Sequence, residues 1–360
     1  MADISRIVII SPSLDISKNI GGISTVAGFV IKNNKKYNYS HFELGKYDKE
    51  KRSAFYLLRI LKGWINWFFL MFRGKNIILH FNIALEKRSL IRDAPLLLLA
   101  HFLKKKLVIH IHGGFYLEKE EMPKWIKTVL TSILSGNEPK IVLSSLEQEL
   151  IVRKYQAKNV FVLPNSLDTE EAKKFKRVCL TETPLRLLFI GRIVKDKGIE
   201  YIFEALKVLR EREVSFKFIM AGSGEDKDEY VGRFSETLGE SFEYRGVISG
   251  DAKTDLLKEC NVFLLPSFYE GLPISLLECM SFAQVPVVTD VGSIKNVVKD
   301  GLNGIIIRKY SSEDIYEAII KLNTEKDLMV TLGTAAQEDI FNFFNPVKYI
   351  EELNRIYDLA

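Results

Sequence analysis

The sequence predicts an α/β protein with two doubly wound parallel sheets, and three observations lead to this fold class. Short β-branched runs alternate with longer helical patterns from end to end, which is typical of βαβ units. Most short runs are continuously apolar, as expected of parallel strands covered on both faces. A polar stretch over 168–184 divides them into two sets, and a chain of 360 residues has the length of about two domains.

The predicted strands fall on either side of this divide. Those of the first set are 6–11, 76–81, 106–112, 140–145 and 159–164. Those of the second set are 185–191, 216–222, 242–246, 261–266, 285–290 and 304–308. Helical patterns separate most of them, for example over 198–211 and 312–322. We therefore expect one domain over 1–168, another over 169–340, and a last helix within 341–360.

Charge is distributed unevenly between the two halves. Residues 1–160 contain 26 Lys and Arg against 13 Asp and Glu, a net +13, whereas the whole chain carries +5 and the remainder −8. The basic half favours an anionic partner, and because no nucleic-acid-binding motif appears, we expect a membrane surface. Three cysteines are too few for a disulfide framework. With no secretory signal pattern at the start, the expected compartment is the cytoplasm.

Glycines and cations follow three of the predicted strands, where doubly wound sheets bind their ligands. Gly21 and Gly22 open a helical pattern, and a helix start offers free N–H groups to a phosphate; a simple turn is the alternative. Arg192 and Lys197 leave one loop together and suit a diphosphate, unless they are solvated surface charges. Gly222 lies in AGSGE, which lacks the remaining features of a dinucleotide fingerprint and argues against a nicotinamide dehydrogenase.

The segment over 263–293 is the most informative. The loop after its strand carries Glu270, Gly271, Leu272 and Pro273, and a proline fits the first turn of a helix. Glu278 follows on that helix. A loop acid and a helix acid beside a helix start can hold two hydroxyl-bearing parts of one ligand. The alternative, two solvated acids, fits Glu278 poorly because its neighbours are apolar.

Together these motifs resemble family 4 of the retaining glycosyltransferases, the "glycosyl transferases group 1" of bacterial surface-polysaccharide assembly, which have the GT-B fold. The pieces occur in the family's order. They are GGIS, HIHGG (110–114), LPNSLD (163–168), FIGRIVKDKGIEYIFEAL (189–206), AGSGE, SFYEGLPISLLECMS (267–281) and VVTDVGSIKNVVKDGLNGIII (287–307). The likeness is dense over 185–310 and sparse but ordered over 1–168.

The resemblance implies two facing Rossmann-like domains with a cleft between them, the first binding the acceptor and the second the nucleotide-sugar donor. Its last helix, in 341–360, would cross back to the first domain. Arg192 and Lys197 would hold the diphosphate, Glu278 the ribose, and Gly222 would line the donor site. Glu270, with the amides around Gly271, Leu272 and Pro273, would hold the transferred sugar.

In the first domain the resemblance implies that Gly22, beside Gly21, approaches the phosphate. His112 would reach the sugar at the reacting centre, the alternative being a buried histidine that bonds to backbone. No metal or other cofactor is expected, since the diphosphate would be stabilised by cations and a helix start. Asp226 and Asp228 form a DxD pattern in a charged run, which we interpret as a solvated loop rather than a metal site.

The segment 53–76 suggests the acceptor. It is densely apolar and aromatic, with Arg59, Lys62, Asn66 and Arg73 along one stripe. Aromatic side chains next to bases are typical of a helix that lies on a membrane, although a core helix is the alternative. The aromatic residues of this interfacial face are Trp64, Trp67, Phe68, Phe69 and Phe72. We therefore expect a lipid-linked oligosaccharide acceptor, as in lipopolysaccharide assembly, at the inner face of the plasma membrane. Two rival functions are a regulatory nucleotide-sugar-binding subunit and a GT-B epimerase that acts on the nucleotide sugar itself.

Overall fold

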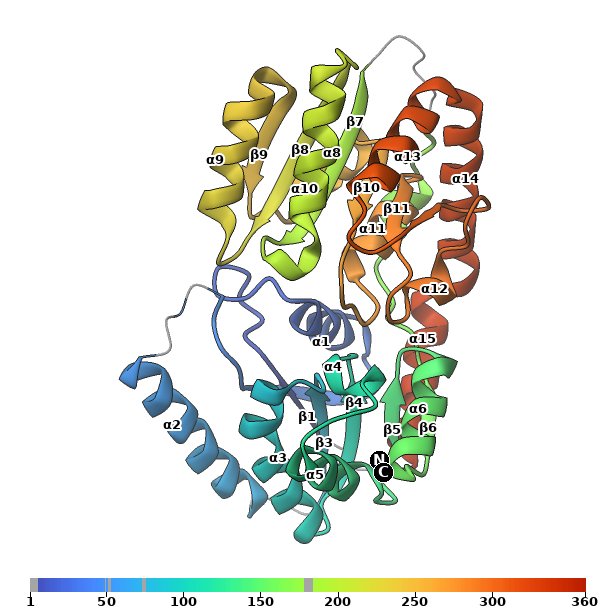
Figure 1. The fold of residues 1–360 in the computed structure, drawn as a ribbon. Helices are drawn as coiled ribbons and strands as arrows, with labels where there is room; N and C mark the ends of the chain where they lie inside the picture. Colours follow the sequence, from blue (N-terminus) through green and yellow to red (C-terminus); the bar gives the residue numbers. More distant parts are fainter. Residues whose placement is uncertain (1–5, 49, 51–52, 73–75, 178–183) are drawn as a thin grey trace. The chain divides into compact units, whose positions relative to one another are not determined.

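The computed structural model describes residues 6–48, 50, 53–72, 76–177 and 184–360. These residues form two compact units (Figure 1). One comprises the chain up to Asn165 together with Val347–Ala360, and the other comprises Ser166–Pro346. The first division falls three residues before the boundary expected at 168, and the chain returns to the first unit at Val347.

The first unit is a six-stranded parallel sheet in the order β2-β1-β3-β4-β5-β6. Its strands are β1 (Arg6–Ser11), β2 (Asn38–Glu43), β3 (Ile77–Ile83), β4 (Lys106–Ile111), β5 (Lys140–Val142) and β6 (Val160–Val162). The predicted strands of this half are confirmed, but β2 was not predicted. Because β2 lies at the sheet edge and its residues are mostly half-buried, it lacks the continuous apolar run that a central strand requires.

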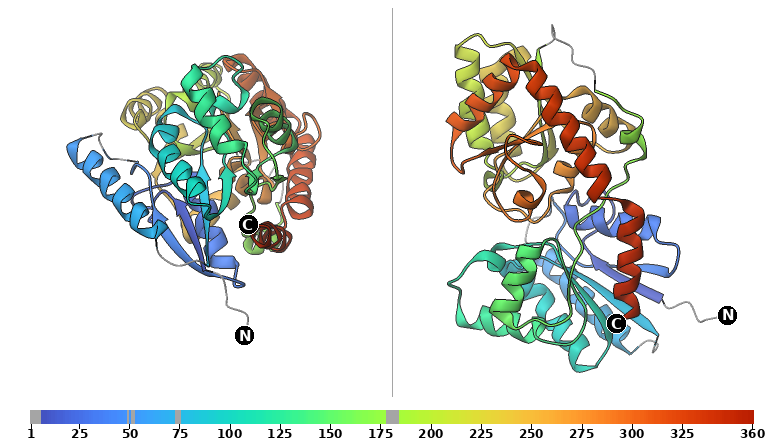
Figure 2. Two further views of the ribbon diagram at one scale, coloured as in Figure 1. Left: turned by 90° about the horizontal axis from the view of Figure 1, so that it is seen from below. Right: turned by 90° about the vertical axis from the view of Figure 1, so that its right-hand side faces the viewer.

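Helices cover both faces of this sheet. They are α1 (Gly22–Asn33), α2 (Ala54–Met71), α3 (Lys87–Phe102), α4 (Phe115–Glu118), α5 (Lys124–Leu134), α6 (Ser145–Tyr155) and α15 (Pro346–Asp358). Side chains of α1 and α15 share one core with Ile7 and Ile9 of β1, whereas Val8 and Ile10 belong to the core beneath α2, α3, α5 and α6. This alternation is that of a strand buried on both faces. Figure 2 shows α15, at the red end of the colour scale, lying along the sheet.

Polar contacts also fasten α15 to the first unit. Asn34 donates from Nδ2 to Oδ1 of Asn354 at 2.7 Å. Lys36 pairs with Asp358 at 2.9 Å, and the Tyr37 hydroxyl donates to the same carboxylate at 2.6 Å. The segment after Val347 is thus an integral part of this unit's structure.

The second unit is also a six-stranded parallel sheet, in the order β12-β11-β10-β7-β8-β9. Its strands are β7 (Leu185–Arg192), β8 (Phe216–Ser223), β9 (Phe242–Gly246), β10 (Val262–Leu265), β11 (Val285–Thr289) and β12 (Ile305–Ile307), which confirms the predicted set. Its helices are α7 (Glu170–Lys173), α8 (Ile199–Glu211), α9 (Lys227–Leu238), α10 (Gly250–Glu259), α11 (Ile274–Ser281), α12 (Ile294–Val297), α13 (Ser312–Thr324) and α14 (Lys326–Phe343). Strand order reverses between β7 and β10, the switch point where such sheets bind ligands.

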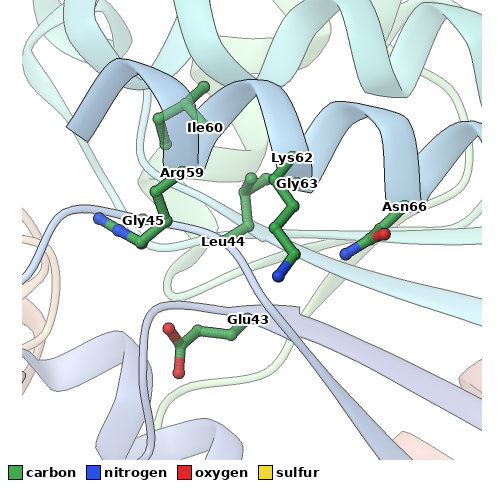
Figure 3. A pocket seen from close by; sticks show the side chains of 8 residues that line it. All are labelled: Glu43, Leu44, Gly45, Arg59, Ile60, Lys62, Gly63 and Asn66. Atoms are coloured by element: carbon green, nitrogen blue, oxygen red, sulfur yellow. The ribbon is translucent and has the colours of Figure 1, made fainter. Parts of the chain in front are cut away.

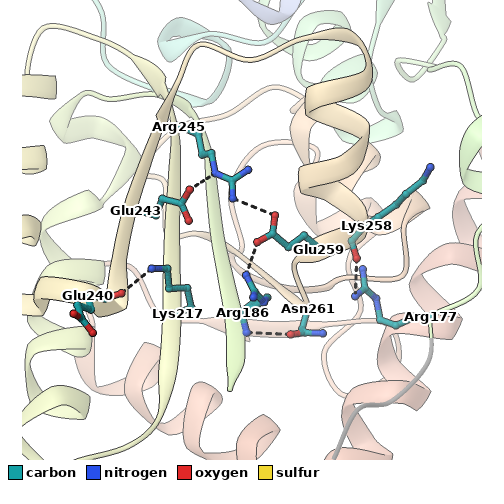
Figure 4. Close-up of polar contacts among 9 residues, drawn as sticks. All are labelled: Arg177, Arg186, Lys217, Glu240, Glu243, Arg245, Lys258, Glu259 and Asn261. Atoms are coloured by element: carbon teal, nitrogen blue, oxygen red, sulfur yellow. Dashed lines mark hydrogen bonds and ion pairs between the residues drawn. The ribbon is translucent and has the colours of Figure 1, made fainter. Parts of the chain in front are cut away.

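A polar network connects β7 and β9 with the end of α10 (Figure 4). Glu259 at the end of α10 accepts hydrogen bonds from Arg186 of β7 and Arg245 of β9. Arg177 donates to the Phe282 and Leu257 carbonyls, and burial lowers the pKa of its guanidinium to about 10. Arg186 lies at the amino end of β7, whereas the ligand-binding loops lie at the carboxyl ends of the strands. This network therefore stabilises the folded unit.

No helix in the described ranges has both the length and the apolar character that crossing a membrane requires.

Candidate active site

The loop after β7 presents an unpaired cation. Arg192 is the last residue of β7, and its side chain is exposed. Within the described part of the chain, its guanidinium makes no hydrogen bond or ion pair. The loop continues through the 3₁₀ turn η1 (Lys195–Lys197), where the Asp196 carbonyl accepts the Phe268 N–H at 2.9 Å. That bond joins the loops after β7 and β10 at the switch point.

Lys197 and Glu270 meet within this junction. The ammonium of Lys197 pairs with Oε1 of Glu270, and both side chains are largely buried, at 16% and 9% exposed. Ser267, fully buried, donates to the same oxygen at 2.7 Å. The Thr289 hydroxyl in turn donates to the Ser267 carbonyl at 2.5 Å. Among the described residues, Oε2 of Glu270 receives no bond, so one oxygen of an oriented carboxylate is available to a ligand.

Two glycines let these loops approach one another closely. A Cβ on Gly222, which has φ +130°, would lie 1.8 Å from the Gly191 carbonyl oxygen. A Cβ on Gly292, which has φ +52°, would lie 2.0 Å from the Glu270 carbonyl oxygen. Glycine alone tolerates both the backbone angles and the space. The role of Gly222 is thus at least architectural, since it holds the end of β8 against that of β7.

The helix α11 begins directly behind the Glu270 loop. Leu272 is buried, Pro273 precedes the first helical residue, and the Gly271 carbonyl accepts the Ser293 N–H at 3.1 Å. The first N–H groups of a helix have no partner inside it, and they carry a positive partial charge. The sequence prediction of a helix start after this loop is confirmed.

The carboxylate of Glu278, on α11, already has a partner. Its carboxylate pairs with Nζ of Lys253, on α10, at 2.5 Å, and its side chain is 19% exposed. The structure therefore places the second acid of the motif against a cation that the sequence analysis had not singled out. A ligand hydroxyl that binds Glu278 would therefore share its carboxylate with the ammonium of Lys253.

Asp226 and Asp228 make different contacts. Asp226 accepts the Lys195 N–H at 2.9 Å and so supports η1, whereas Asp228 is exposed and pairs with Lys227. The predicted solvated loop is therefore only partly correct: Asp228 is exposed, but it lies in the first turn of α9, and Asp226 precedes that helix and shapes the neighbouring turn.

In the first unit, Gly21 and Gly22 begin α1. The Gly21 N–H donates to Oδ1 of Asn19 at 2.8 Å, and the Ser24 hydroxyl donates to the same oxygen at 2.9 Å. No atom of the described residues lies within 4 Å of the position that a Cβ on Gly22 would occupy. The fold of this unit therefore does not itself require glycine at this position.

His112 follows β4, at the carboxyl edge of the sheet. Its Nε2 lies 2.7 Å from Oδ1 of Asn82, and its ring packs against His110 with centroids 4.0 Å apart. Burial, with a smaller contribution from His80, lowers the pKa of His112 to about 3. Asn82 was not anticipated from the sequence, because asparagine inside an apolar strand carries no motif.

A polar hollow of about 120 Å³ lies between α2 and the end of β2. Figure 3 shows Arg59, Lys62 and Asn66 extending from α2, with Glu43 on the strand side. Arg59 is held by Glu50 at 2.5 Å and Glu43 by the Tyr47 hydroxyl at 2.6 Å. The predicted polar stripe of this helix thus exists for Arg59, Lys62 and Asn66, while Arg73 lies outside the described residues.

Another face of α2 is apolar and exposed. Its exposed side chains are Phe55, Leu57, Leu58, Leu61, Ile65, Phe68, Phe69 and Phe72. Trp67 is the exception, since it is fully buried between Phe42 and Phe81 and its indole N–H donates to the Leu96 carbonyl. The sequence analysis had grouped Trp67 with an interfacial aromatic face; that assignment was wrong, because helix packing turns Trp67 inward.

Comparison with known proteins identifies the second unit. Residues 170–339 match the model described as "Glycosyl transferases group 1". These residues form a group 1 glycosyltransferase domain. The match covers Arg192, Lys197, Gly222, the Glu270 loop and Glu278, so the resemblance inferred from these motifs is confirmed.

Relatives and solved structures agree with this family. An uncharacterized glycosyltransferase of Methanocaldococcus jannaschii is 26% identical over 259 residues, 69% of this chain and 63% of that protein, so the chain spans just under two thirds of that relative's length. A galactosyltransferase of Escherichia coli is 22% identical over 270 residues, covering 69% and 68%. Anabaena HepE, solved with UDP-glucose, aligns with a TM-score of 0.75 at 15% identity over 99% of this chain and 100% of that one. The group 1 domain and its partner unit thus have the GT-B fold, as predicted.

Proposed function

We propose that this protein is a retaining, metal-independent hexosyltransferase of family 4. It would transfer a sugar from a UDP- or GDP-sugar to a lipid-linked saccharide. The observation that carries this proposal is the junction at the switch point of the group 1 domain. There Arg192, which has no partner among the described residues, the Lys197–Glu270 pair and the start of α11 lie on loops after neighbouring strands.

The donor chemistry follows from the charges of this junction. Breaking the sugar–phosphate bond leaves a nucleoside diphosphate with growing negative charge. Arg192 has no competing partner among the described residues, so it can bind the diphosphate without first breaking an ion pair. Lys197 and the free N–H groups of α11 add positive charge that is already oriented, which is the usual largest contribution to catalysis.

The acids would hold the sugars at either end of the diphosphate. Ser267 and Lys197 bind one oxygen of Glu270, which leaves the other for a hydroxyl of the transferred sugar. Glu278, supported by Lys253, would hold the ribose. His112 would contact the sugar near the reacting carbon, and Gly22 would approach the phosphate.

Two observations support a lipid-linked acceptor. The exposed apolar face of α2 belongs to the same helix as the exposed base Lys62, and an apolar face combined with basic residues is typical of a helix that lies in a membrane interface. The relatives include the UDP-Gal:alpha-D-GlcNAc-diphosphoundecaprenol alpha-1,3-galactosyltransferase of Escherichia coli and the capsular polysaccharide biosynthesis glycosyltransferase CapM of Staphylococcus aureus. We accordingly place the protein on the inner face of the plasma membrane as a peripheral protein.

The test begins with the donor. A thermal-shift screen of UDP, GDP, ADP and their sugars should raise the melting temperature with one nucleotide family, because a ligand that binds only the folded state stabilises it. The selected donor should then be consumed in the presence of an undecaprenyl-diphosphate-linked sugar. NMR of the product should show the donor's anomeric configuration, and EDTA should leave the rate unchanged.

Other outcomes point to the rival functions. Donor binding without hydrolysis or transfer would favour a regulatory subunit. Conversion of the nucleotide sugar without any acceptor would favour an epimerase. A strict requirement for a divalent ion would overturn the metal-independent mechanism.

A further inference from the structure

The hydrogen bonds around Asn82 determine which way its amide faces. Its Nδ2 donates to the Ile10 carbonyl at 3.0 Å, and the side chain is buried. A carbonyl can only accept, so the NH₂ group must lie on that side. Oδ1 of Asn82 therefore faces Nε2 of His112, 2.7 Å away.

This orientation selects the tautomer of His112. Since Oδ1 can only accept, Nε2 of His112 must carry a proton. Burial keeps the ring neutral at neutral pH by lowering its pKa to about 3. The proton on Nε2 then leaves Nδ1 as a bare acceptor.

Nδ1 is the open side of the ring. It makes no hydrogen bond within the described part of the chain, and its surface is not completely buried. It therefore reaches solvent, although the ring as a whole is only partly exposed.

Three buried rings, those of His110, His80 and Tyr357, lie in a row beside His112. His110 packs on it, and Nδ1 of His110 lies 3.2 Å from Nε2 of His80. His80 in turn lies 2.5 Å from the hydroxyl of Tyr357, on α15. His80 and His110 are both buried, and burial lowers the pKa of each, so the row adds no positive charge beside His112.

We propose that Asn82 is a positioning residue that locks His112 with the proton on Nε2, so that Nδ1 accepts a hydrogen bond from a hydroxyl of the bound sugar. This inference rests on the proposed glycosyl transfer. It assigns His112 the role of an acceptor, neither a cation nor a proton donor toward the substrate.

A matched pair of variants tests which ring nitrogen matters. The amide of Asn occupies the place of Nδ1, whereas the longer Gln reaches the place of Nε2. His112→Asn should therefore retain about 10-fold more turnover than His112→Gln, the worth of one hydrogen bond. Equal activities, or a more active Gln variant, would overturn the proposal.

Variants of Asn82 separate positioning from mere packing. Leucine has a similar volume to asparagine but cannot accept a hydrogen bond from Nε2 of His112. Turnover of Asn82→Leu should therefore fall about 10-fold. Asn82→Asp still accepts from Nε2, but its charge raises the pKa of His112. Its activity should therefore match the wild type at high pH and fall as the pH decreases through that raised pKa, while the wild type stays active. A purely structural role would lower Asn82→Leu and Asn82→Asp activity equally at every pH.

NMR tests the tautomer independently of catalysis. In protein labelled with ¹⁵N-histidine, the signal missing from His112→Asn identifies His112. Its nitrogens should show a protonated Nε2 and a bare Nδ1 in the wild type, and a mixture in Asn82→Leu. A protonated Nδ1 in the wild type would refute the inference even if transfer is observed. Absence of transfer with every donor would instead refute the proposed function and leave this measurement to decide on Asn82.

Discussion

The exposed face of α2 makes the membrane proposal quantitative. Phe68 and Phe69 are 50% and 59% exposed, so together they offer roughly one full aromatic side chain, about 200 Å². At about 25 cal/mol per Å², complete coverage by lipid would contribute about 5 kcal/mol, and half coverage about 2.5 kcal/mol. The double substitution Phe68→Ser/Phe69→Ser should therefore weaken vesicle binding at least about 70-fold.

Sedimentation with vesicles measures this effect. The wild type should bind anionic vesicles, bind neutral ones weakly, and dissociate partly in high salt, because each base near the surface contributes about 1 kcal/mol that salt screens. Phe343→Ser is the matched control, since Phe343 is also exposed but lies on α14 of the second unit. Its binding should equal that of the wild type.

Two results would refute the reasoning. The double variant could sediment as well as the wild type while remaining folded, in which case these rings do not face lipid. The wild type could also fail to bind anionic vesicles at all, and a water-soluble acceptor would then become the better proposal. Trp67 is unsuitable for this test, because it is buried and its replacement would destabilise the fold.

Three further predictions concern the group 1 domain. Arg192→Ala should lower turnover on the order of 100-fold, whereas Arg212→Ala, an exposed arginine that contacts Tyr316, should not; full activity of the first would remove Arg192 from the mechanism. Glu278→Ala should raise the donor dissociation constant more than it lowers turnover, because ribose contacts change little in the transition state, and calorimetry that finds unchanged affinity would contradict this role. Asp314→Asn should cost about 1 kcal/mol at pH 7, because it removes the carboxylate that pairs with Arg308 and accepts a hydrogen bond from the Ser311 hydroxyl. Because Arg308 lowers the pKa of Asp314 below 3.8, this loss should shrink as the pH falls below that value, and denaturant melts at pH 7 and pH 3 would show it.

The sequence by itself was enough to predict the described strands other than β2 and the local structure of the Glu270 loop. Continuous apolar runs such as 261–266 predict buried parallel strands, because both faces of such a strand are covered. The residues around Glu270 and Pro273 also predict a loop between a strand and a helix, since a strand end and a helix start are local features. Edge strand β2 was missed because partial burial leaves no comparable pattern.

Only the tertiary structure decided which side chains meet. In α2 both Trp67 and Phe68 are aromatic, and packing against Phe42 and Phe81 determines that Trp67 is the buried one. Lys253 is 25 residues from Glu278 in sequence, yet the two form an ion pair. Asn82 likewise reaches His112 only because β3 and β4 pair in register. Such contacts depend on how separate βαβ units pack, and local sequence patterns carry no information about that.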